Sequence, residues 1–242
     1  PGWHTECVVM IHKEFNEELI DIHGGGQDLK FPHHENESAQ NKALHHHDLA
    51  NYWVHNAMLN IDNEKMSKSL GNVQWAKDFI AEFGSNVSRW ILLSTHYRLV
   101  LNITDELIHQ AITEVSRIES ALNKASVLLQ VNDISSDRID EESFTRFFEA
   151  LKDDLNVANA QKEVFALLKK LNQSIRAKDM DSLLSQYATI LKMMNVLGLD
   201  FDLIKLNEED VENMRLWEKL KKEKNFDEAD KIRDLLSERG II

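Results

Sequence analysis

The distribution of helix-breaking residues most constrains how this sequence can fold. Both prolines and six of the eight glycines lie before residue 85, and long amphipathic stretches with few breakers follow. Gly and Pro interrupt regular helices, so this change predicts an α/β part followed by an all-helical part. We place one division between residues 84 and 85. A second division separates a small C-terminal helical segment, which gives three parts: 1–84, 85–206 and 207–242.

Local patterns predict the elements of both parts. In the first part, "LIDIH" (19–23) is typical of a strand that runs into a glycine loop, and "NYWVHNAMLNI" (51–61) contains a strand. We expect a helix over 32–47, a polar loop over 63–72, and a helix over 74–83 that stops at Gly84, after which Ser85 caps the next helix. In the second part we expect helices at about 104–130, 141–152, 157–176, 180–197, 208–223 and 227–238, with Gly198 and Gly240 as helix stops.

Composition excludes several classes of protein. The net charge of −13 argues against broad adhesion to nucleic acid or to an anionic membrane. No apolar run approaches the roughly 20 residues that span a bilayer. The single cysteine, Cys7, excludes an internal disulfide and fits either a reducing cytoplasm or a metal ligand. The chain starts at Pro1 rather than at Met, so we expect further residues upstream.

The stretch "FPHHENE" (31–37) holds two histidines and two glutamates behind a proline. Proline is tolerated in a first helical turn, so we expect the histidines at a helix start. His33 and Glu37 are four residues apart and share a face. Together with Cys7 they offer three ligand types that zinc prefers. The alternative is a buried cysteine beside a polar helix start, and His34 and Glu35 are equal candidates on spacing alone. The "HHH" at 45–47 is more typical of a solvated helix end.

Two further stretches contain residues that could bind a ligand or take part in catalysis. In "GGGQD", Gly24 to Asp28, glycines after a strand let the backbone approach a ligand closely, although the pattern alone favours an ordinary loop and the dinucleotide fingerprint is absent. In "KMSKS" (65–69), Lys65 and Lys68 flank a flexible loop. Lysine suits phosphate oxygens, so this loop could stabilise charge on a pyrophosphate leaving group.

These blocks together resemble one family of enzymes. "KMSKS" is the second signature of the class I aminoacyl-tRNA synthetases. Together with "PGWHTEC" (1–7), "DIHGGGQDLKFPHHENE" (21–37) and "KMSKSLGN" (65–72), it resembles the cysteinyl-tRNA synthetases. "DDLNVANA" (153–160) and "NFDEADKIRDLLSERGI" (225–241) resemble that family's helical regions. The resemblance extends from end to end and implies part of a Rossmann-type catalytic domain followed by a helical tRNA-binding region.

The resemblance implies roles for individual residues. It implies that Cys7, His33 and Glu37 hold one zinc ion that binds the substrate's sulfur, with a fourth ligand, a cysteine, upstream of this sequence. It also implies that the nucleotide-binding signature lies upstream, so this chain alone would be inactive. The remaining implied site residues are Trp3 in the cysteine pocket, His23 and Asp28 near the substrate's polar groups, Gly24, Gly25 and Gly26 beneath the adenylate, and Lys68 on the ATP phosphates with Lys65 as its helper.

The implied activity is ATP-dependent activation of cysteine and its transfer to the cysteine tRNA. The partners would be cysteine, ATP with Mg²⁺, and the tRNA, and we expect a cytoplasmic monomer with no membrane contact. Three alternatives remain: a related zinc-dependent ligase that joins cysteine to an amino sugar, a tRNA-binding fragment without catalysis, and a generic zinc hydrolase. Cations near the C-terminus could form a local RNA-binding patch, although the interleaved acids favour a solvated hairpin for each residue taken singly: Arg215, Lys219, Lys221, Lys222, Lys224, Lys231, Arg233 and Arg239.

Overall fold

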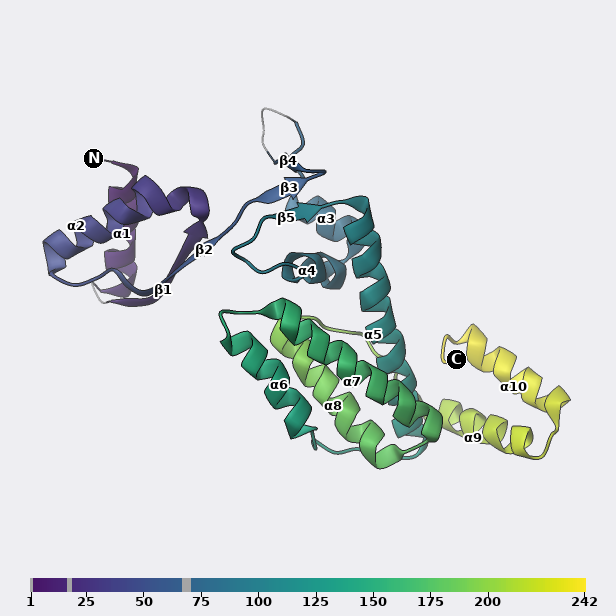
Figure 1. Cartoon of the computed structure of the whole chain (residues 1–242). Coiled ribbons are helices and arrows are strands. Elements are labelled where there is room, and N and C mark those ends of the chain that lie inside the picture. The colour runs from purple at the N-terminus through teal and green to yellow at the C-terminus, as the bar shows by residue number, and fades with distance from the viewer. Residues whose placement is uncertain (1, 17–18, 67–70) are drawn as a thin grey trace. The chain divides into compact units, whose positions relative to one another are not determined.

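The computed structural model describes residues 2–16, 19–66 and 71–242 (Figure 1). Contacts divide the chain into two compact units. The first holds Pro1–Gln74 and Thr95–Thr104, and the second holds Trp75–Ser94 and Asp105–Ile242. The mixed α/β beginning and the helical continuation confirm the predicted fold class. The three-part division at residues 84/85 and 206/207 stays a proposal.

The first unit combines two helices with two small sheets. Its strands β1 and β2 pair in parallel, with His23 opposite Trp53. A second sheet has the order β4-β3-β5, in which β3 is antiparallel to β4 and parallel to β5. The elements are α1 (Trp3–Phe15), β1 (Ile20–Gly26), α2 (Glu35–His45), β2 (Ala50–Asn56), β3 (Leu59–Ile61), β4 (Glu64–Lys65) and β5 (Leu101–Ile103). No sequence pattern predicts α1 or β5, and β4 lies within the stretch predicted as a polar loop (63–72).

The three glycines lie in strand β1, so the predicted glycine loop after the strand is wrong. Gly24, Gly25 and Gly26 continue the parallel pairing with β2. At Gly25 the absence of a side chain is needed. A Cβ at Gly25 would lie 2.7 Å from Cε1 of His34, closer than such atoms approach. The glycine therefore makes room for the His34 ring against the sheet.

Helix α2 begins later than predicted. Phe31 has an extended backbone (φ −137°, ψ 133°), and the Phe31–Pro32 peptide is cis. A residue before proline is driven away from helical dihedrals, so the regular helix starts only after this point. His33 and His34 thus lie in an irregular turn (Lys30–His34), directly before α2 rather than inside its first turn.

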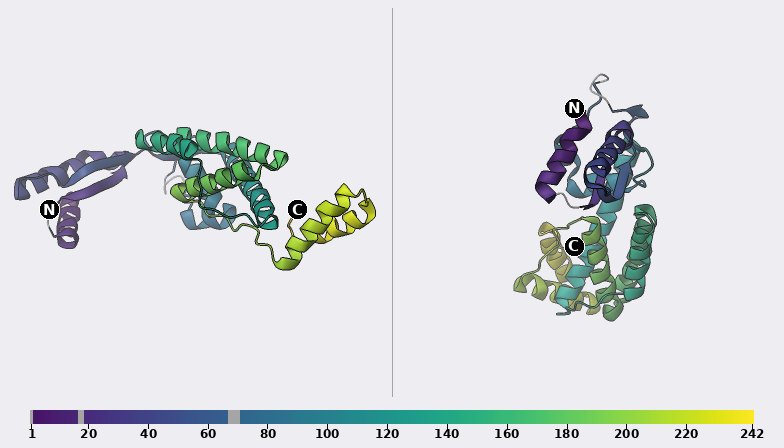
Figure 2. Two further views of the ribbon diagram at one scale, coloured as in Figure 1. Left: turned by 90° about the horizontal axis from the view of Figure 1, so that it is seen from below. Right: turned by 90° about the vertical axis from the view of Figure 1, so that its left-hand side faces the viewer.

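The second unit is helical and confirms the predicted helices closely. Its elements are α3 (Ala76–Phe83), α4 (Ser85–Leu93), α5 (Asp105–Val131), α6 (Glu141–Lys152), α7 (Val157–Ala177), α8 (Met180–Leu197), α9 (Glu208–Lys222) and α10 (Phe226–Glu238). Helices α6, α7 and α8 pack side by side, and α7 and α8 also contact α5 (Figures 1 and 2). Their core contains the fully buried side chains of Ile118, Leu122, Phe147, Leu171 and Ile190. None of the helices in the described part of the chain is both long and apolar enough to cross a bilayer.

The glycines predicted to stop helices lie at helix ends, whereas the serine predicted to cap a helix does not cap it. Gly84 follows α3 and Gly198 ends α8 in the left-handed region (φ 74°), as predicted. Gly240 lies one residue beyond the cap of α10, also with positive φ. The capping role predicted for Ser85 is wrong. Gly84 occupies the N-cap of α4, and Ser85 is already the first helical residue.

Asp140 caps the N-terminus of α6 and gives a testable contribution to stability. Its Oδ1 accepts a hydrogen bond from the backbone N–H of Ser143 (3.0 Å), and its Oδ2 accepts one from Ser143 Oγ (2.8 Å). Burial acts to raise the pKa of Asp140, but these hydrogen bonds and nearby cations outweigh it and lower the pKa. The charged form is therefore the one that stabilises the folded state.

We expect Asp140→Ala to lower the free energy of unfolding by about 1 kcal/mol at pH 7. Because the pKa is lowered on folding, the contribution is present above the unfolded-state pKa and is lost as pH falls through the folded-state value. Urea unfolding at pH 7 and at pH 3 measures both effects. A variant that remains 1 kcal/mol less stable at the lower pH would contradict the charge-based account.

Candidate functional site

Three potential metal ligands from separate elements converge in the first unit. Cys7 lies on α1, His33 lies in the turn before α2, and Glu37 lies in the first turn of α2, and α1 packs against α2. Cys7 Sγ is 3.7 Å from His33 Nε2, and His33 Nε2 is 2.8 Å from Glu37 Oε1. One ligand atom of each residue lies within 4.8 Å of the others. The predicted set is thus brought together.

Glu37 is the most constrained member of this cluster. Its side chain is 0% exposed, and Oε2 accepts a 2.6 Å hydrogen bond from His23 Nε2. Oε1 lies 2.8 Å from Nε2 of His33, but no hydrogen bond of good geometry reaches it from the described residues. Burial acts to raise the pKa of Glu37, but the His23 hydrogen bond and the neighbouring histidines lower it. A buried carboxylate with one unsatisfied oxygen is the arrangement that a bound cation would complete.

Cys7 supports the same interpretation. Burial raises the pKa of its thiol, and the negative charge of Glu37 raises it further. Without a cation the thiol therefore stays protonated. A divalent ion among these three side chains would reverse the effect, because a coordinated thiol is deprotonated. The donor set of thiolate, imidazole and carboxylate fits zinc.

Two further histidines lie beside the cluster: His34, a candidate on spacing alone, and His55, which is not among the predicted site residues. His34 Nδ1 lies 2.8 Å from His55 Nε2, and His34 is 4% exposed. His23, His34 and Glu37 form a second group whose ligand atoms lie within 4.8 Å of one another. Burial lowers the pKa of both His34 and His55, which favours neutral rings. Strand alternation could have indicated His55. It lies two residues after Trp53 on β2, and residues two apart on a strand face the same side. Glu35, the other candidate by spacing, is exposed.

Of the remaining predicted site residues, Trp3 contacts this cluster, and Asp28 and Lys65 lie on other elements of the first unit. The Trp3 ring lies against His33, with centroids 4.2 Å apart, and remains 65% exposed. Asp28 is exposed in the short turn Gln27–Leu29 that follows β1. Lys65 is exposed on β4, paired in register with Asn60. Lys68 lies outside the described residues.

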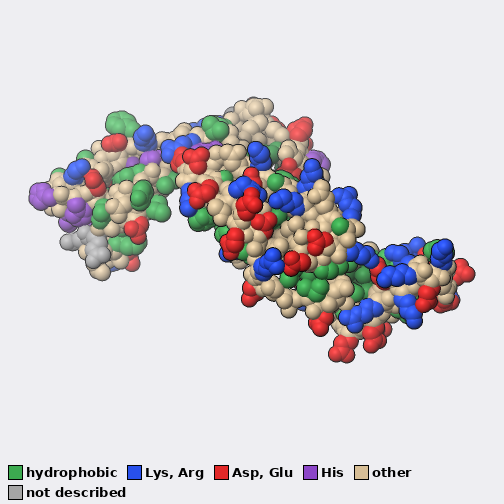
Figure 3. Space-filling view, turned by 60° about the horizontal axis from the view of Figure 1, so that its bottom comes forward, with side chains coloured by type: hydrophobic (Ala, Val, Ile, Leu, Met, Phe, Trp, Pro, Cys, Tyr) green, Lys and Arg blue, Asp and Glu red, His purple; other side chains and the backbone are tan. Residues whose placement is uncertain are grey.

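Several cations of the C-terminal hairpin α9–α10 are paired with acids. Lys231 pairs with Glu228 at 2.7 Å, Arg233 with Asp230 at 2.9 Å, and Arg239 with Asp210 at 2.9 Å. Figure 3 shows Lys and Arg interspersed with Asp and Glu over this hairpin. The arrangement favours a solvated hairpin over a continuous basic patch.

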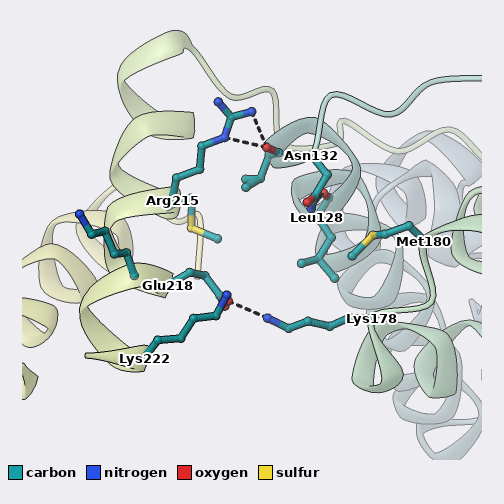
Figure 4. Close-up of a pocket in the computed structure, with 10 residues that line it drawn as sticks. Leu128, Asn132, Lys178, Met180, Arg215, Glu218 and Lys222 are labelled. Atoms are coloured by element: carbon teal, nitrogen blue, oxygen red, sulfur yellow. Dashed lines mark hydrogen bonds and ion pairs between the residues drawn. The ribbon is translucent and has the colours of Figure 1, made fainter. Parts of the chain in front are cut away.

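A cavity of about 400 Å³ lies where α9 meets the ends of α5 and α7 (Figure 4). Arg215 Nε and Nη2 both donate to Val131 O, at 2.9 and 2.7 Å. Lys178 pairs with Glu218 at 2.6 Å across the same cavity. A small core that includes Val127 and Met214 lies beside them. These contacts tie the hairpin to the bundle.

We expect Arg215→Ala to loosen this junction by about 1.5–3 kcal/mol, because two hydrogen bonds from a charged donor are lost. Hydrogen exchange of the α9 and α10 amides should then be faster while exchange in α6 stays unchanged. Lys219→Ala is the control, since Lys219 lies on the same helix and only reaches Glu223 at 4.0 Å. Equal effects of the two substitutions would contradict the role given to Arg215.

Comparisons with known proteins agree with this architecture. Residues 1–113 match the family described as tRNA synthetases class I (C) catalytic domain, and residues 146–202 match the DALR domain. The chain is 40% identical over 242 residues to the cysteine–tRNA ligase of Acholeplasma laidlawii, covering 100% of this chain and 54% of that protein. It is 39% identical over 244 residues to that of Mesoplasma florum, covering 55% of that protein.

Two solved structures share the fold at low sequence identity. A LeuRS from Agrobacterium radiobacter K84 aligns with a TM-score of 0.61 and 16% identity, over 79% of this chain and 30% of that one. The methionyl-tRNA synthetase of Mycobacterium tuberculosis aligns with a TM-score of 0.56 and 17% identity, over 73% and 41%.

The domain matches assign residues 1–113 to the class I aminoacyl-tRNA synthetase catalytic domain and residues 146–202 to the DALR domain. Within that class, the whole chain is similar to curated cysteine–tRNA ligases. It spans just over half the length of the curated relatives that it matches.

Proposed function

We propose that this chain acts within a cysteine–tRNA ligase. In this proposal the complete protein activates cysteine with ATP to cysteinyl adenylate and pyrophosphate, then esterifies the cysteine tRNA and releases AMP. The chain matches only about half of each relative, with the catalytic-domain match confined to residues 1–113. We therefore propose that it is inactive alone. It would work as a monomer in the cytoplasm.

The observation that carries the proposal is the convergence of Cys7, His33 and Glu37 around an unsatisfied buried carboxylate oxygen. These three side chains would hold zinc, and His23 would orient Glu37 through its 2.6 Å hydrogen bond. Such a second partner commonly fixes the orientation of a metal-binding side chain. Zinc, when bound, would favour the deprotonated form of a coordinated substrate thiol.

This arrangement would also explain selection of cysteine over serine. An apolar pocket discriminates poorly between small isosteric groups, whereas a site built to bind one polar group rejects an analogue that lacks it far more strongly. Soft thiolate sulfur is a preferred ligand of zinc, and a hydroxyl is not. In the proposed site Trp3, which lies against His33, would form one wall beside the substrate side chain.

The nucleotide would be bound by other parts of the first unit. In this proposal ATP enters with Mg²⁺, Gly24–Gly26 lie beneath the adenylate, and His23 and Asp28 lie near polar groups of the substrate. Lys65 and Lys68 would stabilise the negative charge that develops on the phosphates. Glycines that occupy a strand fit a close approach of ligand to backbone as well as a loop would.

The match of residues 146–202 to the DALR domain supports tRNA as the acceptor over an amino sugar. A tRNA-charging assay with the complete protein discriminates the two: radiolabelled cysteine should become attached to a transcript of the cysteine tRNA. Transfer to an amino sugar with none to tRNA would support the alternative ligase. Binding of tRNA without any charging would support a non-catalytic role.

A further inference from the structure

A groove of about 610 Å³ runs between α5 and α7, apart from the cluster around Glu37 and from the junction of Figure 4. Both helices belong to the second unit. Three apolar residues contribute to its lining, and the remaining lining residues are polar or cationic: Thr113, Ser116, Arg117, Ser120, Lys124 and Asn172. None of the residues lining this groove is acidic, although the whole chain carries a net charge of −13.

The polar side chains from α5 form one continuous strip. Residues 113, 116, 117, 120 and 124 recur at intervals of three or four, the spacing of one helix face. With a rise of 1.5 Å per residue, the strip is about 16 Å long. Such a strip can follow a chain of several consecutive nucleotides rather than a single small ion.

The two cations of the groove are available to bind an anion. The Arg117 guanidinium lies 5.7 Å from the centroid of the Phe165 ring, which orients it without neutralising it. Within the described residues, neither Arg117 nor Lys124 forms an ion pair with a carboxylate. The closest acid in sequence to Arg117 on the same face, Glu114, already accepts hydrogen bonds from Trp90 and Gln110. In contrast, several cations of α9 already pair with an acid or donate hydrogen bonds to a backbone carbonyl.

Hydroxyl groups lie between these cations. Thr113 Oγ1 donates to His109 O at 2.9 Å and keeps its acceptor capacity. Ser116 and Ser120 are exposed and make no side-chain hydrogen bond within the described part of the chain. A hydroxyl both donates and accepts, as the ribose 2′-OH does. Hydroxyl–ribose contacts are a means by which proteins distinguish RNA from DNA.

We propose that the α5–α7 groove binds the ribose–phosphate backbone of the tRNA, with Arg117 and Lys124 on phosphates and Ser116 and Ser120 on ribose hydroxyls. The inference rests on the proposed function, since that function makes tRNA the partner, and it identifies where on the bundle the backbone lies. Backbone contacts of this type position the nucleic acid without reading its bases.

The first test measures binding of the 242-residue chain to a fluorescent transcript of the cysteine tRNA across a series of KCl concentrations. The double variant Arg117→Gln/Lys124→Gln should bind about tenfold more weakly at 0.1 M salt. The slope of log K against log salt should fall by about 1.5, as expected for two lost phosphate contacts. The matched control is Lys77→Gln/Arg138→Gln, which removes the same charges from exposed positions outside the groove.

The second test compares this RNA with DNA of the same sequence. Ser116→Ala/Ser120→Ala should weaken RNA binding several-fold and leave DNA binding unchanged. Two results would overturn this inference and leave the proposed function standing. One is an equal loss of binding in the groove variant and the control charge variant. The other is an equal loss of RNA and DNA binding in the serine variant. Failure of the unaltered chain to bind the transcript would contradict both the inference and the tRNA partner. Circular dichroism of each variant checks its folding.

Discussion

Glu37→Gln is expected to weaken zinc binding by this chain at least about 100-fold. The change keeps the size of the side chain and removes the charge of a fully buried carboxylate. Loss of a partner that merely orients a ligand costs about 10–100-fold in affinity, so loss of a ligand's own charge should cost more. The measurement is competition for zinc against a chromophoric chelator at pH 7.5, with zinc content after dialysis as a second readout.

Glu35→Gln is the matched control for this experiment. It lies in the same helical turn and removes the same charge, but its side chain is exposed. We expect it to bind zinc like the unaltered chain. Retention of tight zinc binding by Glu37→Gln, or an equal loss in Glu35→Gln, would show that the cluster of Cys7, His33 and Glu37 is not the metal site.

Lys68→Ala is expected to slow adenylate formation by about 10²–10³-fold in the complete enzyme, because one donor of transition-state charge stabilisation is lost. Zinc content should stay unchanged, since in the proposed function the loop binds the phosphates rather than the metal. ATP–pyrophosphate exchange measures the rate. Lys77→Ala, which removes an exposed cation from α3, should leave it unchanged. A fall in zinc content together with activity would instead indicate a structural role for the loop.

The regular spacing of apolar residues along each helix made the helical unit predictable. Helices α6 and α8 have the predicted bounds, and the glycine at 198 ends α8 as expected. In these helices the apolar spacing continues over several turns, so local sequence determines both the type of element and its ends. The small strand β5 was not predictable, because its three residues gain their pairing from β3, about 40 positions earlier in the chain.

The first unit was harder to predict for the same physical reason. The glycines at 24–26 are strand residues because β2 pairs with them, which no local pattern reveals. The ligand types around Glu37 could be chosen from spacing and resemblance. The 2.6 Å hydrogen bond from His23 and the contact between His34 and His55 depend on strand register and on the turn before α2. Ser85 illustrates a local rule that failed, because Gly84 already supplies the N-cap.

In the proposed site, the zinc held by Cys7, His33 and Glu37 selects the sulfur of cysteine. ATP–pyrophosphate exchange by the complete, zinc-loaded enzyme tests it most directly, with cysteine and serine compared at equal concentrations. We expect exchange with cysteine to exceed exchange with serine by about 10⁴-fold or more, as for a site that binds one specific polar group. Removal of zinc should lower the cysteine rate towards the serine rate. Comparable exchange with both amino acids in the zinc-loaded enzyme would show that zinc does not select the substrate's sulfur.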